Sequence, residues 1–160
     1  MASELRVGHG FDVHRFARKR KLILGGIEIP HSSGLVGHSD ADVLLHALIN
    51  ALLGAMGKGD IGSHFPDGDP RYKNIASTKL LQKILLLMRK GRWRLINADV
   101  TVIAQQPKLA PYYSAIRSKV AKQCKAPLKN VNIKATTTEK LGWIGAGKGI
   151  AATAVVLLRR

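Results

Sequence analysis

The chain has 160 residues, 46% of them hydrophobic, which predicts one globular domain over residues 1–160. No apolar run approaches the roughly 18 residues that a membrane span requires, so we expect neither a span nor a membrane partner. The only cysteine, Cys124, excludes an internal disulfide and favours a reducing compartment. The net charge of +16, from 26 basic and 10 acidic residues, is a pattern that often accompanies anionic partners.

The distribution of the charges nevertheless argues against a nucleic-acid partner. The basic residues are spread over a loop and several predicted helix faces and form no single stripe. Seven of the ten acidic residues lie in turns rich in Gly, His or Thr or at a helix start: Asp12, Asp40, Asp42, Asp60, Asp67, Asp69 and Glu139. All six histidines fall in the first 64 residues. We therefore expect the carboxylates and imidazoles to form a site.

The chain is predicted to begin with two strands. Residues 5–11 and 22–29 are short apolar runs bounded by glycine or proline, and a basic loop over 15–21 joins them. Because strand-like sequence begins near Leu5, we expect no signal peptide before it.

The next segment changes to a helical period over residues 40–56. Its apolar face is formed by Val43, Leu44, Ala47, Leu48, Ala51, Leu52 and Ala55. We expect Ser39 to cap this helix, with Asp42 in the third position. The opposite stripe is polar, because Asp42, His46 and Asn50 follow one another at four-residue intervals.

The remaining predicted elements follow in chain order: a loop over 57–71, a helix over 77–89, a strand over 95–105, a helix over 111–123, a strand over 131–137, a glycine-rich turn over 142–149 and a strand over 150–158. Strands and helices thus intermix, so the predicted fold class is α/β (mixed α+β). We expect a single compact domain in which helices cover a sheet.

Three residues suggest a metal site. Asp12 and His14 are two apart near the end of a predicted strand, so both side chains leave the same face. His46 is the third candidate ligand, on the polar stripe of the helix, although a lone helical histidine is more often structural. Two nitrogens and one oxygen with an open fourth position favour a catalytic zinc, and manganese or cobalt would also fit. Asp42, one turn before His46, either orients its imidazole or only caps the helix.

Further segments could bind phosphates and hydroxyls. His38 and Ser39 precede the helix, where free backbone N–H groups attract an anion, although Ser39 could simply cap. Residues 60–62 and 65–69 could hold the hydroxyls of a polyol or ribose, or be ordinary turns. Residues 136–139, Thr-Thr-Thr-Glu, could hold phosphate and magnesium, or reflect strand propensity alone. Residues 105–108 offer backbone groups and one lysine.

Seven motifs in order carry a resemblance to a known family: GHGFDVHRF, LILGGIEIP, GLVGHSDADVLLHAL, GDIGSHFPDGDP, DVTVIAQQPKLAP, VNIKATTTEKLGW and GKGIAATAVVLL. Together they resemble the 2-C-methyl-D-erythritol 2,4-cyclodiphosphate synthases of the non-mevalonate route to isoprenoid precursors, over residues 5–158.

The resemblance implies a lyase that converts 4-diphosphocytidyl-2-C-methyl-D-erythritol 2-phosphate into the cyclodiphosphate and CMP. It implies a homotrimer of α/β subunits with active sites between subunits, in the bacterial cytoplasm or, after loss of a transit peptide, the plastid stroma. Zinc would be held by Asp12, His14 and His46, and magnesium or manganese by Glu139 with the substrate phosphates. His38 and Thr137 would stabilise the transition state.

The resemblance also implies a larger substrate-binding set, part of it from the adjoining subunit. The set comprises Asp12, Val13, His14, His38, Ser39, Asp60, Ile61, Gly62, Phe65, Pro66, Asp67, Gly68, Asp69, Ala104, Gln105, Gln106, Pro107, Lys108, Leu109, Ala110, Thr136, Thr137, Thr138, Glu139 and Trp143.

A few residues depart from the family pattern. Asn50 stands where an aspartate is expected, Ala146 and Lys148 replace an arginine and a glutamate, and 109–110 is Leu-Ala instead of Met-Leu. The arginine is associated with isoprenoid diphosphates in the trimer cavity, so Ala146 argues against that regulatory site. The alternative function, motivated by the charge and these changes, is a catalytically weakened basic homologue that binds nucleotides or nucleic acid.

Overall fold

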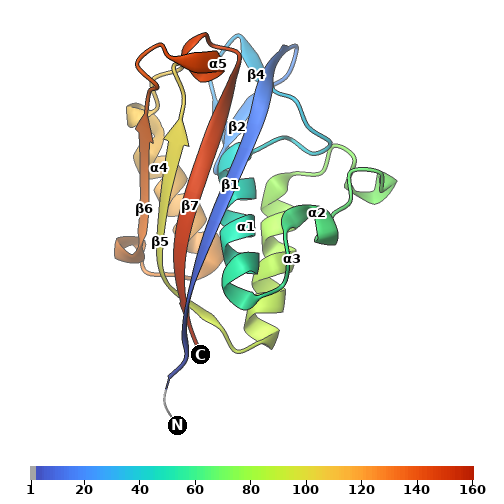
Figure 1. The fold of residues 1–160 in the computed structure, drawn as a ribbon, viewed down its shortest axis with the longest axis vertical. Helices are drawn as coiled ribbons and strands as arrows, with labels where there is room; N and C mark the ends of the chain where they lie inside the picture. Colours follow the sequence, from blue (N-terminus) through green and yellow to red (C-terminus); the bar gives the residue numbers. More distant parts are fainter. Residues whose placement is uncertain (1–2) are drawn as a thin grey trace.

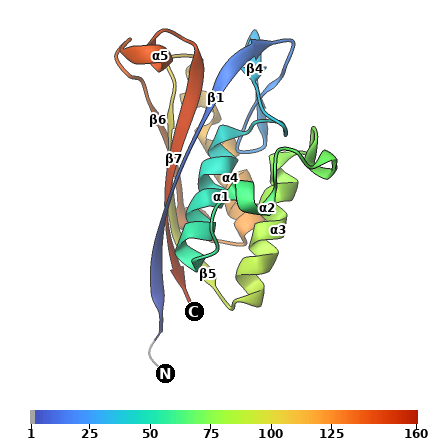
Figure 2. The same cartoon turned by 45° about the vertical axis from the view of Figure 1, so that its right-hand side comes forward.

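The computed structural model describes residues 3–160 and is built on one five-stranded sheet with helices on a single face (Figures 1 and 2). The strand order is β4-β1-β7-β5-β6, and β2 and β3 form a separate hairpin. The strands are β1 (Leu5–Arg18), β2 (Leu22–Leu24), β3 (Ile27–Ile29), β4 (Ser33–Leu35), β5 (Arg94–Ile103), β6 (Val131–Thr136) and β7 (Gly149–Arg159). The predicted α/β class, with a sheet covered by helices, is confirmed.

The helices are α1 (Val43–Met56), α2 (Ile61–His64), α3 (Ser77–Lys90), α4 (Tyr113–Cys124) and α5 (Gly142–Gly145), with short 3₁₀ turns η1 (Pro70–Tyr72), η2 (Ala110–Tyr112) and η3 (Leu128–Asn130). No helix within residues 3–160 is long and apolar enough to cross a membrane.

Helix α1 is the centre of the core. It lies against β1 and β7 on one side and contacts α3 on another, so all its residues except Asn50 and Gly54 are buried. The predicted polar stripe therefore does not face solvent, and His46 is only 8% exposed. A polar side chain in this position must find partners inside the protein.

Two glycines let β1 approach α1 closely. A Cβ atom on Gly8 would lie 1.9 Å from the carbonyl oxygen of Ala51, and one on Gly10 would lie 2.0 Å from the carbonyl oxygen of Ala47. The strand can therefore pack directly on the helix backbone, and β1 runs beside α1 in Figure 2. Asp12 and His14 lie farther along the same face of β1 as Gly8 and Gly10, so they come close to the start of α1.

Several predicted boundaries near the N-terminus were wrong. Strand β1 continues to Arg18 because its second half pairs with β4, with Phe16 opposite Leu35, so most of the predicted basic loop is strand. The predicted strand over 22–29 is a hairpin, in which Leu22 pairs with Ile29 around a tight Gly-Gly turn. The Gly-Gly pair is a recognised hairpin signal that the prediction missed. Strand β4 carries no strong pattern of its own, because it is strand only through pairing with β1.

Helix boundaries also differed from the prediction. Helix α1 begins at Val43, and its cap is Asp42, whose side chain accepts a hydrogen bond from the backbone N–H of Leu45 at 3.1 Å; Ser39 is not the cap. The predicted loop over 57–71 contains α2 and most of η1, and the glycine-rich turn contains α5. These elements are too short to show an apolar period, and the side chains of Asp60 and Asp69 cap α2 and η1.

The sheet face that carries no helix is partly apolar. Side chains that alternate with the inward-facing residues stand exposed on this face: Leu5, Val7, Phe11, Val13 and Val155. An uncovered row of this kind marks a candidate surface for another protein chain.

Candidate active site

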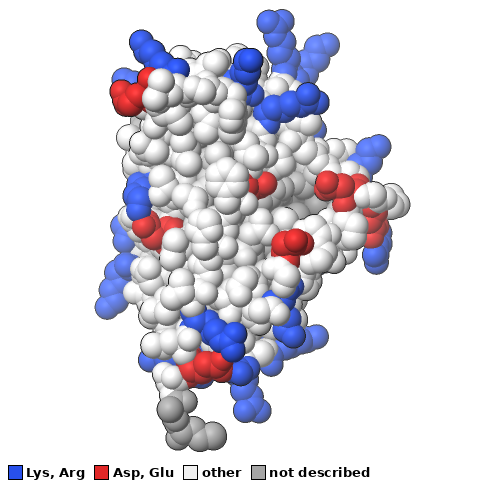
Figure 3. All heavy atoms as spheres, in the orientation of Figure 1, with Lys and Arg blue, Asp and Glu red and all other residues white. Residues whose placement is uncertain are grey.

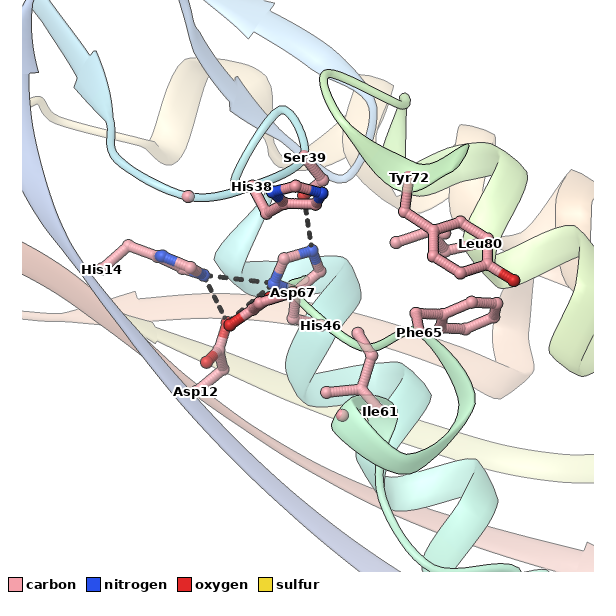
Figure 4. A pocket seen from close by; sticks show the side chains of 12 residues that line it. Asp12, His14, His38, Ser39, His46, Ile61, Phe65, Asp67, Tyr72 and Leu80 are labelled. Carbon is pink, nitrogen blue, oxygen red and sulfur yellow. Dashed lines mark hydrogen bonds and ion pairs between the residues drawn. The ribbon is translucent and has the colours of Figure 1, made fainter. Parts of the chain in front are cut away.

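Three side chains meet beside the start of α1 (Figure 4). Asp12 and His14 leave the inner face of β1, and His46 reaches them from α1. The Oδ2 atom of Asp12 lies 2.9 Å from Nε2 of His14 and 3.0 Å from Nδ1 of His46, and the two nitrogens are 3.1 Å apart. The predicted proximity of these residues is confirmed, and they form a group able to hold a metal ion.

The geometry suits a small divalent cation. Tetrahedral zinc, with bonds of about 2.0–2.2 Å, holds its ligand atoms about 3.3–3.6 Å apart. The three separations, from 2.9 to 3.1 Å, are shorter by a few tenths of an ångström, so slight outward movement would complete the geometry. The open side faces the pocket in which Figure 4 places His38 and Asp67.

The surroundings of His14 leave its Nε2 atom free as an acceptor. Its other nitrogen, Nδ1, lies 2.6 Å from the carbonyl oxygen of Val36. A carbonyl only accepts hydrogen bonds, so Nδ1 carries the proton and Nε2 presents a lone pair to Asp12 and His46 in the neutral ring. An acceptor nitrogen beside a carboxylate is repelled unless a cation or a proton lies between them, and a metal ion meets that demand.

Charge interactions within this group perturb its acid–base behaviour. Burial raises the pKa of Asp12, but the imidazoles of His14 and His46, when protonated on the nitrogens that face it, donate hydrogen bonds that outweigh burial and lower the pKa to about 2. Burial lowers the pKa of His14, yet the hydrogen bond from its protonated ring to Asp12 and the charge of Asp12 raise it overall. The carboxylate therefore stays ionised at neutral pH and provides a negative ligand.

Asp42 was expected either to orient the imidazole of His46 or only to cap the helix. Its side chain caps α1 and does not contact the imidazole. Its carboxylate accepts hydrogen bonds from the backbone N–H groups of Gly25 at 2.9 Å, Gly26 at 2.6 Å and Leu45 at 3.1 Å. Complete burial, with the charge of Asp40 nearby, raises the pKa of Asp42 to about 6. Asp42 therefore ties the β2–β3 hairpin to α1.

The pocket around the three side chains contains only part of the predicted substrate-binding set. The predicted residues that line it are Asp12, His14, His38, Ser39, His46, Ile61, Gly62, Phe65 and Asp67. Gly37, Tyr72 and Leu80 line it too and were missed. The Tyr72 ring meets the Phe65 ring edge-on, with ring centroids 5.2 Å apart, and the two rings form an apolar wall of the pocket.

Other predicted residues support the pocket from outside. Asp60 caps α2 by accepting from the N–H of Ser63 at 2.8 Å, and Asp69 binds Arg71 while its carbonyl oxygen lies 3.1 Å from Nε2 of His38. Val13 points to the opposite face of the sheet and is 42% exposed. Pro66 and Gly68 do not line the pocket.

Asn50 has a structural role next to this pocket. Its Oδ1 atom accepts a hydrogen bond from the N–H of Ile61 at 2.8 Å. The side chain therefore connects α1 to the start of α2, whose residues Ile61 and Gly62 line the pocket. An aspartate would accept the same bond, so the departure at this position keeps that contact.

The remaining predicted residues gather at the carboxyl ends of β5 and β6. The two strands are parallel, and the N–H of Ala104 donates to the carbonyl oxygen of Thr136 at 3.0 Å. Gln105 accepts a hydrogen bond from the N–H of Lys140 at 3.2 Å. The segments 104–110 and 136–139 thus form one cluster, which we call the β5–β6 cluster.

Within the β5–β6 cluster, the hydroxyl of Thr137 donates to Glu139 at 2.9 Å, and both side chains are exposed. Trp143, in α5, is 44% exposed. None of these residues lines the pocket around His46, and β7 lies between β1, which carries Asp12 and His14, and β5 (Figure 1).

Comparison with known proteins gives a match along nearly the whole chain. The model of the YgbB family matches residues 5–159. The chain belongs to the YgbB family. A curated YgbB-like relative, 2-C-methyl-D-erythritol 2,4-cyclodiphosphate synthase from Syntrophotalea carbinolica, is 56% identical over 156 residues, which cover 98% of this chain and 95% of the relative. The resemblance inferred from the motifs is confirmed.

Solved structures agree with the YgbB assignment. The bifunctional IspDF from Campylobacter jejuni matches with a TM-score of 0.95 and 44% identity; the match covers 99% of this chain but only 43% of that longer protein. A 2C-methyl-D-erythritol-2,4-cyclodiphosphate synthase, described as a CDP-bound form, has a TM-score of 0.88 and 37% identity, covering 96% of this chain and 99% of that one.

The alternative of a basic nucleic-acid-binding homologue is not favoured for this YgbB-family chain. The synthases of Syntrophotalea carbinolica and Geobacillus kaustophilus match this chain over 95% and 98% of their own length. On the face shown in Figure 3, Lys and Arg side chains gather toward the ends and margins of the molecule, without a continuous stripe along the surface.

Proposed function

We propose that this chain converts 4-diphosphocytidyl-2-C-methyl-D-erythritol 2-phosphate into 2-C-methyl-D-erythritol 2,4-cyclodiphosphate and CMP. The observation that carries the proposal is the meeting of Asp12, His14 and His46 at one pocket, in a chain that matches synthases of this name almost end to end. An oxygen of the 2-phosphate bonds to the β-phosphorus, the bond from that phosphorus to the bridging oxygen breaks, and CMP leaves with that oxygen.

The residues suit this reaction because its main obstacle is electrostatic. Two phosphate groups repel each other, and little covalent work falls to the protein, so positioning and charge neutralisation dominate. A divalent cation, zinc in our proposal, held by Asp12, His14 and His46 would supply positive charge beside the phosphate oxygens. The nucleophile is already ionised near neutral pH, so no general base is required.

His38 is proposed to donate to phosphate oxygens within the same pocket. Its Nε2 atom is engaged with the carbonyl oxygen of Asp69 at 3.1 Å, so Nε2 carries a proton. Donation to substrate would use this proton after the bond to Asp69 is released. Ile61, Gly62 and Phe65 would enclose the methylerythritol portion, because they line the same pocket.

The β5–β6 cluster is proposed to hold the cytidine and its diphosphate from a neighbouring copy of the chain. Support comes from its separation from the His46 pocket and from the uncovered apolar face of β1 and β7, a surface that a homotrimer would bury. Thr137 and Glu139, already in contact, would bind phosphate and a magnesium or manganese ion. The bacterial relatives support a cytoplasmic location.

Release of CMP tests the proposed activity. Protein supplied with zinc and magnesium should release CMP stoichiometrically with the cyclodiphosphate, and a chelator should stop the reaction until both metals are restored. The products can be separated by chromatography. If metal-loaded protein releases no CMP from the authentic substrate, the proposed function is wrong.

Replacement of Glu139 by glutamine tests the second metal separately. Because an amide binds magnesium less strongly than a carboxylate, Glu139→Gln should require more magnesium for half-maximal rate, while bound zinc, measured by elemental analysis, stays unchanged. Glu28→Gln is the control, since Glu28 pairs with Lys21 elsewhere on the surface. An unaltered magnesium response in Glu139→Gln would remove this residue from the metal-binding set.

A further inference from the structure

His46 presents different surroundings to its two ring nitrogens. Its Nδ1 atom faces Asp12 and His14, as described above. Its Nε2 atom points into the protein, 2.9 Å from the hydroxyl oxygen of Ser77 and 3.1 Å from that of Ser39 (Figure 4 shows the second contact). Which nitrogen carries the proton therefore depends on whether these hydroxyls accept or donate.

The direction of the hydrogen bonds is decided at Ser77. This fully buried serine is the first residue of α3, and its hydroxyl donates to Oδ1 of Asp40 at 2.5 Å, while its backbone N–H donates to Oδ2 at 3.1 Å. An ionised carboxylate can only accept. A hydroxyl has one proton, and Ser77 uses it in the hydrogen bond to Asp40. Ser77 can therefore only accept a hydrogen bond from His46.

The hydrogen bond to Ser77 also decides which ring nitrogen of His46 carries the proton. Because Ser77 accepts, Nε2 of His46 must carry the proton, and the neutral ring keeps an unprotonated Nδ1. In the opposite tautomer, the Nδ1 proton would point at the Asp12 carboxylate 3.0 Å away and would have to leave before a metal could bind.

We propose that Asp40, through Ser77, is a positioning residue that sets the tautomer of His46 and so keeps Nδ1 available to a divalent cation. The inference rests on the proposed function only in taking Nδ1 as a metal ligand. Neither Asp40 nor Ser77 would touch the metal ion or the substrate; the chain of hydrogen bonds runs from His46 to Ser77 to Asp40.

The fold holds this chain of hydrogen bonds in place. Asp40 is fixed by its backbone N–H, which donates to the carbonyl oxygen of Ile75 at 3.0 Å, two residues before α3. Its Oδ1 atom also accepts from the N–H of Asp42 at 3.3 Å. The hydroxyl of Ser39 is a less decisive partner, since it accepts from the N–H of Ala41 at 3.1 Å but has no carboxylate acceptor to fix its own proton.

The first test reads the tautomer directly in metal-free protein. Long-range ¹H–¹⁵N correlation spectra of the histidine rings, at about pH 8 so that ordinary imidazoles are neutral, distinguish a protonated from an unprotonated nitrogen. We expect Nε2 of His46 to carry a proton in the unmodified chain, with or without a second proton on Nδ1, and its signals are assigned by their loss in His46→Ala. A ring protonated on Nδ1 alone would overturn the proposal even if neither Ser77→Ala nor Asp40→Asn folds.

The second test uses Ser77→Ala and Asp40→Asn, with Asp42→Asn as the matched control. We expect the first two to populate the Nδ1–H tautomer and to weaken zinc binding, measured by competition with a chelator, by about 10–100-fold, as loss of a partner behind a metal ligand typically does. Asp42→Asn alters a buried carboxylate two residues away that does not contact His46, so it should keep the tautomer and the affinity.

The outcomes separate this proposal from the proposed function. Unchanged tautomer and zinc affinity in folded Ser77→Ala and Asp40→Asn would overturn the positioning role, whatever the activity of the enzyme. Conversely, the tautomer can be as expected while the unmodified chain releases no CMP, in which case the proposed reaction fails and the hydrogen-bond chain remains.

Discussion

Replacing His46 by alanine is expected to abolish stable zinc binding and to reduce CMP release by more than about 100-fold, because loss of even an outer partner of a ligand typically costs 10–100-fold. The substitution removes one of the three candidate ligands, whose atoms lie within 4.8 Å of one another. It also leaves the hydroxyl of Ser77 with one partner fewer inside the protein.

Zinc content after dialysis and the rate of CMP release should be measured together on His46→Ala. His31→Ala is a suitable control, because His31 bonds to the carbonyl oxygen of Ser33 and lies outside the pocket. Circular dichroism and the oligomeric state should be the same in all three proteins. Normal zinc content in folded His46→Ala would refute the ligand assignment.

The largest effect on stability is expected for Gly10→Ala. The new methyl carbon would lie 2.0 Å from the carbonyl oxygen of Ala47 and 2.6 Å from the backbone nitrogen of Ala51. Both atoms belong to the backbone of α1, which cannot move aside as a side chain can. Because inserted carbons in packed cores already cost about 1–3 kcal/mol, we expect a loss of at least about 3 kcal/mol and a fall in Tm of about 10 °C.

Gly54→Ala is the matched control on the same helix. The nearest atom to a Cβ at this position is the carbonyl oxygen of His9 at 3.7 Å, an ordinary contact. Alanine favours the helix over glycine by roughly 1 kcal/mol, so thermal unfolding should show a small gain in stability. Equal effects of the two substitutions would contradict the close packing of β1 on α1.

Long periodic elements could be predicted from local sequence. Helix α3 spans Ser77–Lys90, against a prediction of 77–89, and all five of its predicted apolar residues are buried: Leu80, Leu81, Ile84, Leu85 and Met88. The core strands β5, β6 and β7 were also predicted within one or two residues at each end. The second half of β1 could not be predicted, because it is strand only through pairing with β4 and β7.

The candidate site, like the fold, could be predicted from the sequence only in part. The two-residue period of a strand was enough to put Asp12 and His14 on one side, and the motifs pointed to His46. The partner behind His46 could not be found from spacing: Asp42, one turn away on the same helix, was the nearest candidate, yet Asp40 acts through Ser77, 37 residues farther along the chain. That contact exists only because α3 packs against α1.

Sequence by itself determined the family, the reaction class and the three candidate metal ligands, because motif order and residue chemistry are local properties of the chain. The tertiary structure alone decided which nitrogen of each histidine faces that pocket, and that the β5–β6 cluster lies apart from it. Hydrogen-bond direction and the distance between strand ends depend on how separate segments pack, and no periodicity within a segment contains that information.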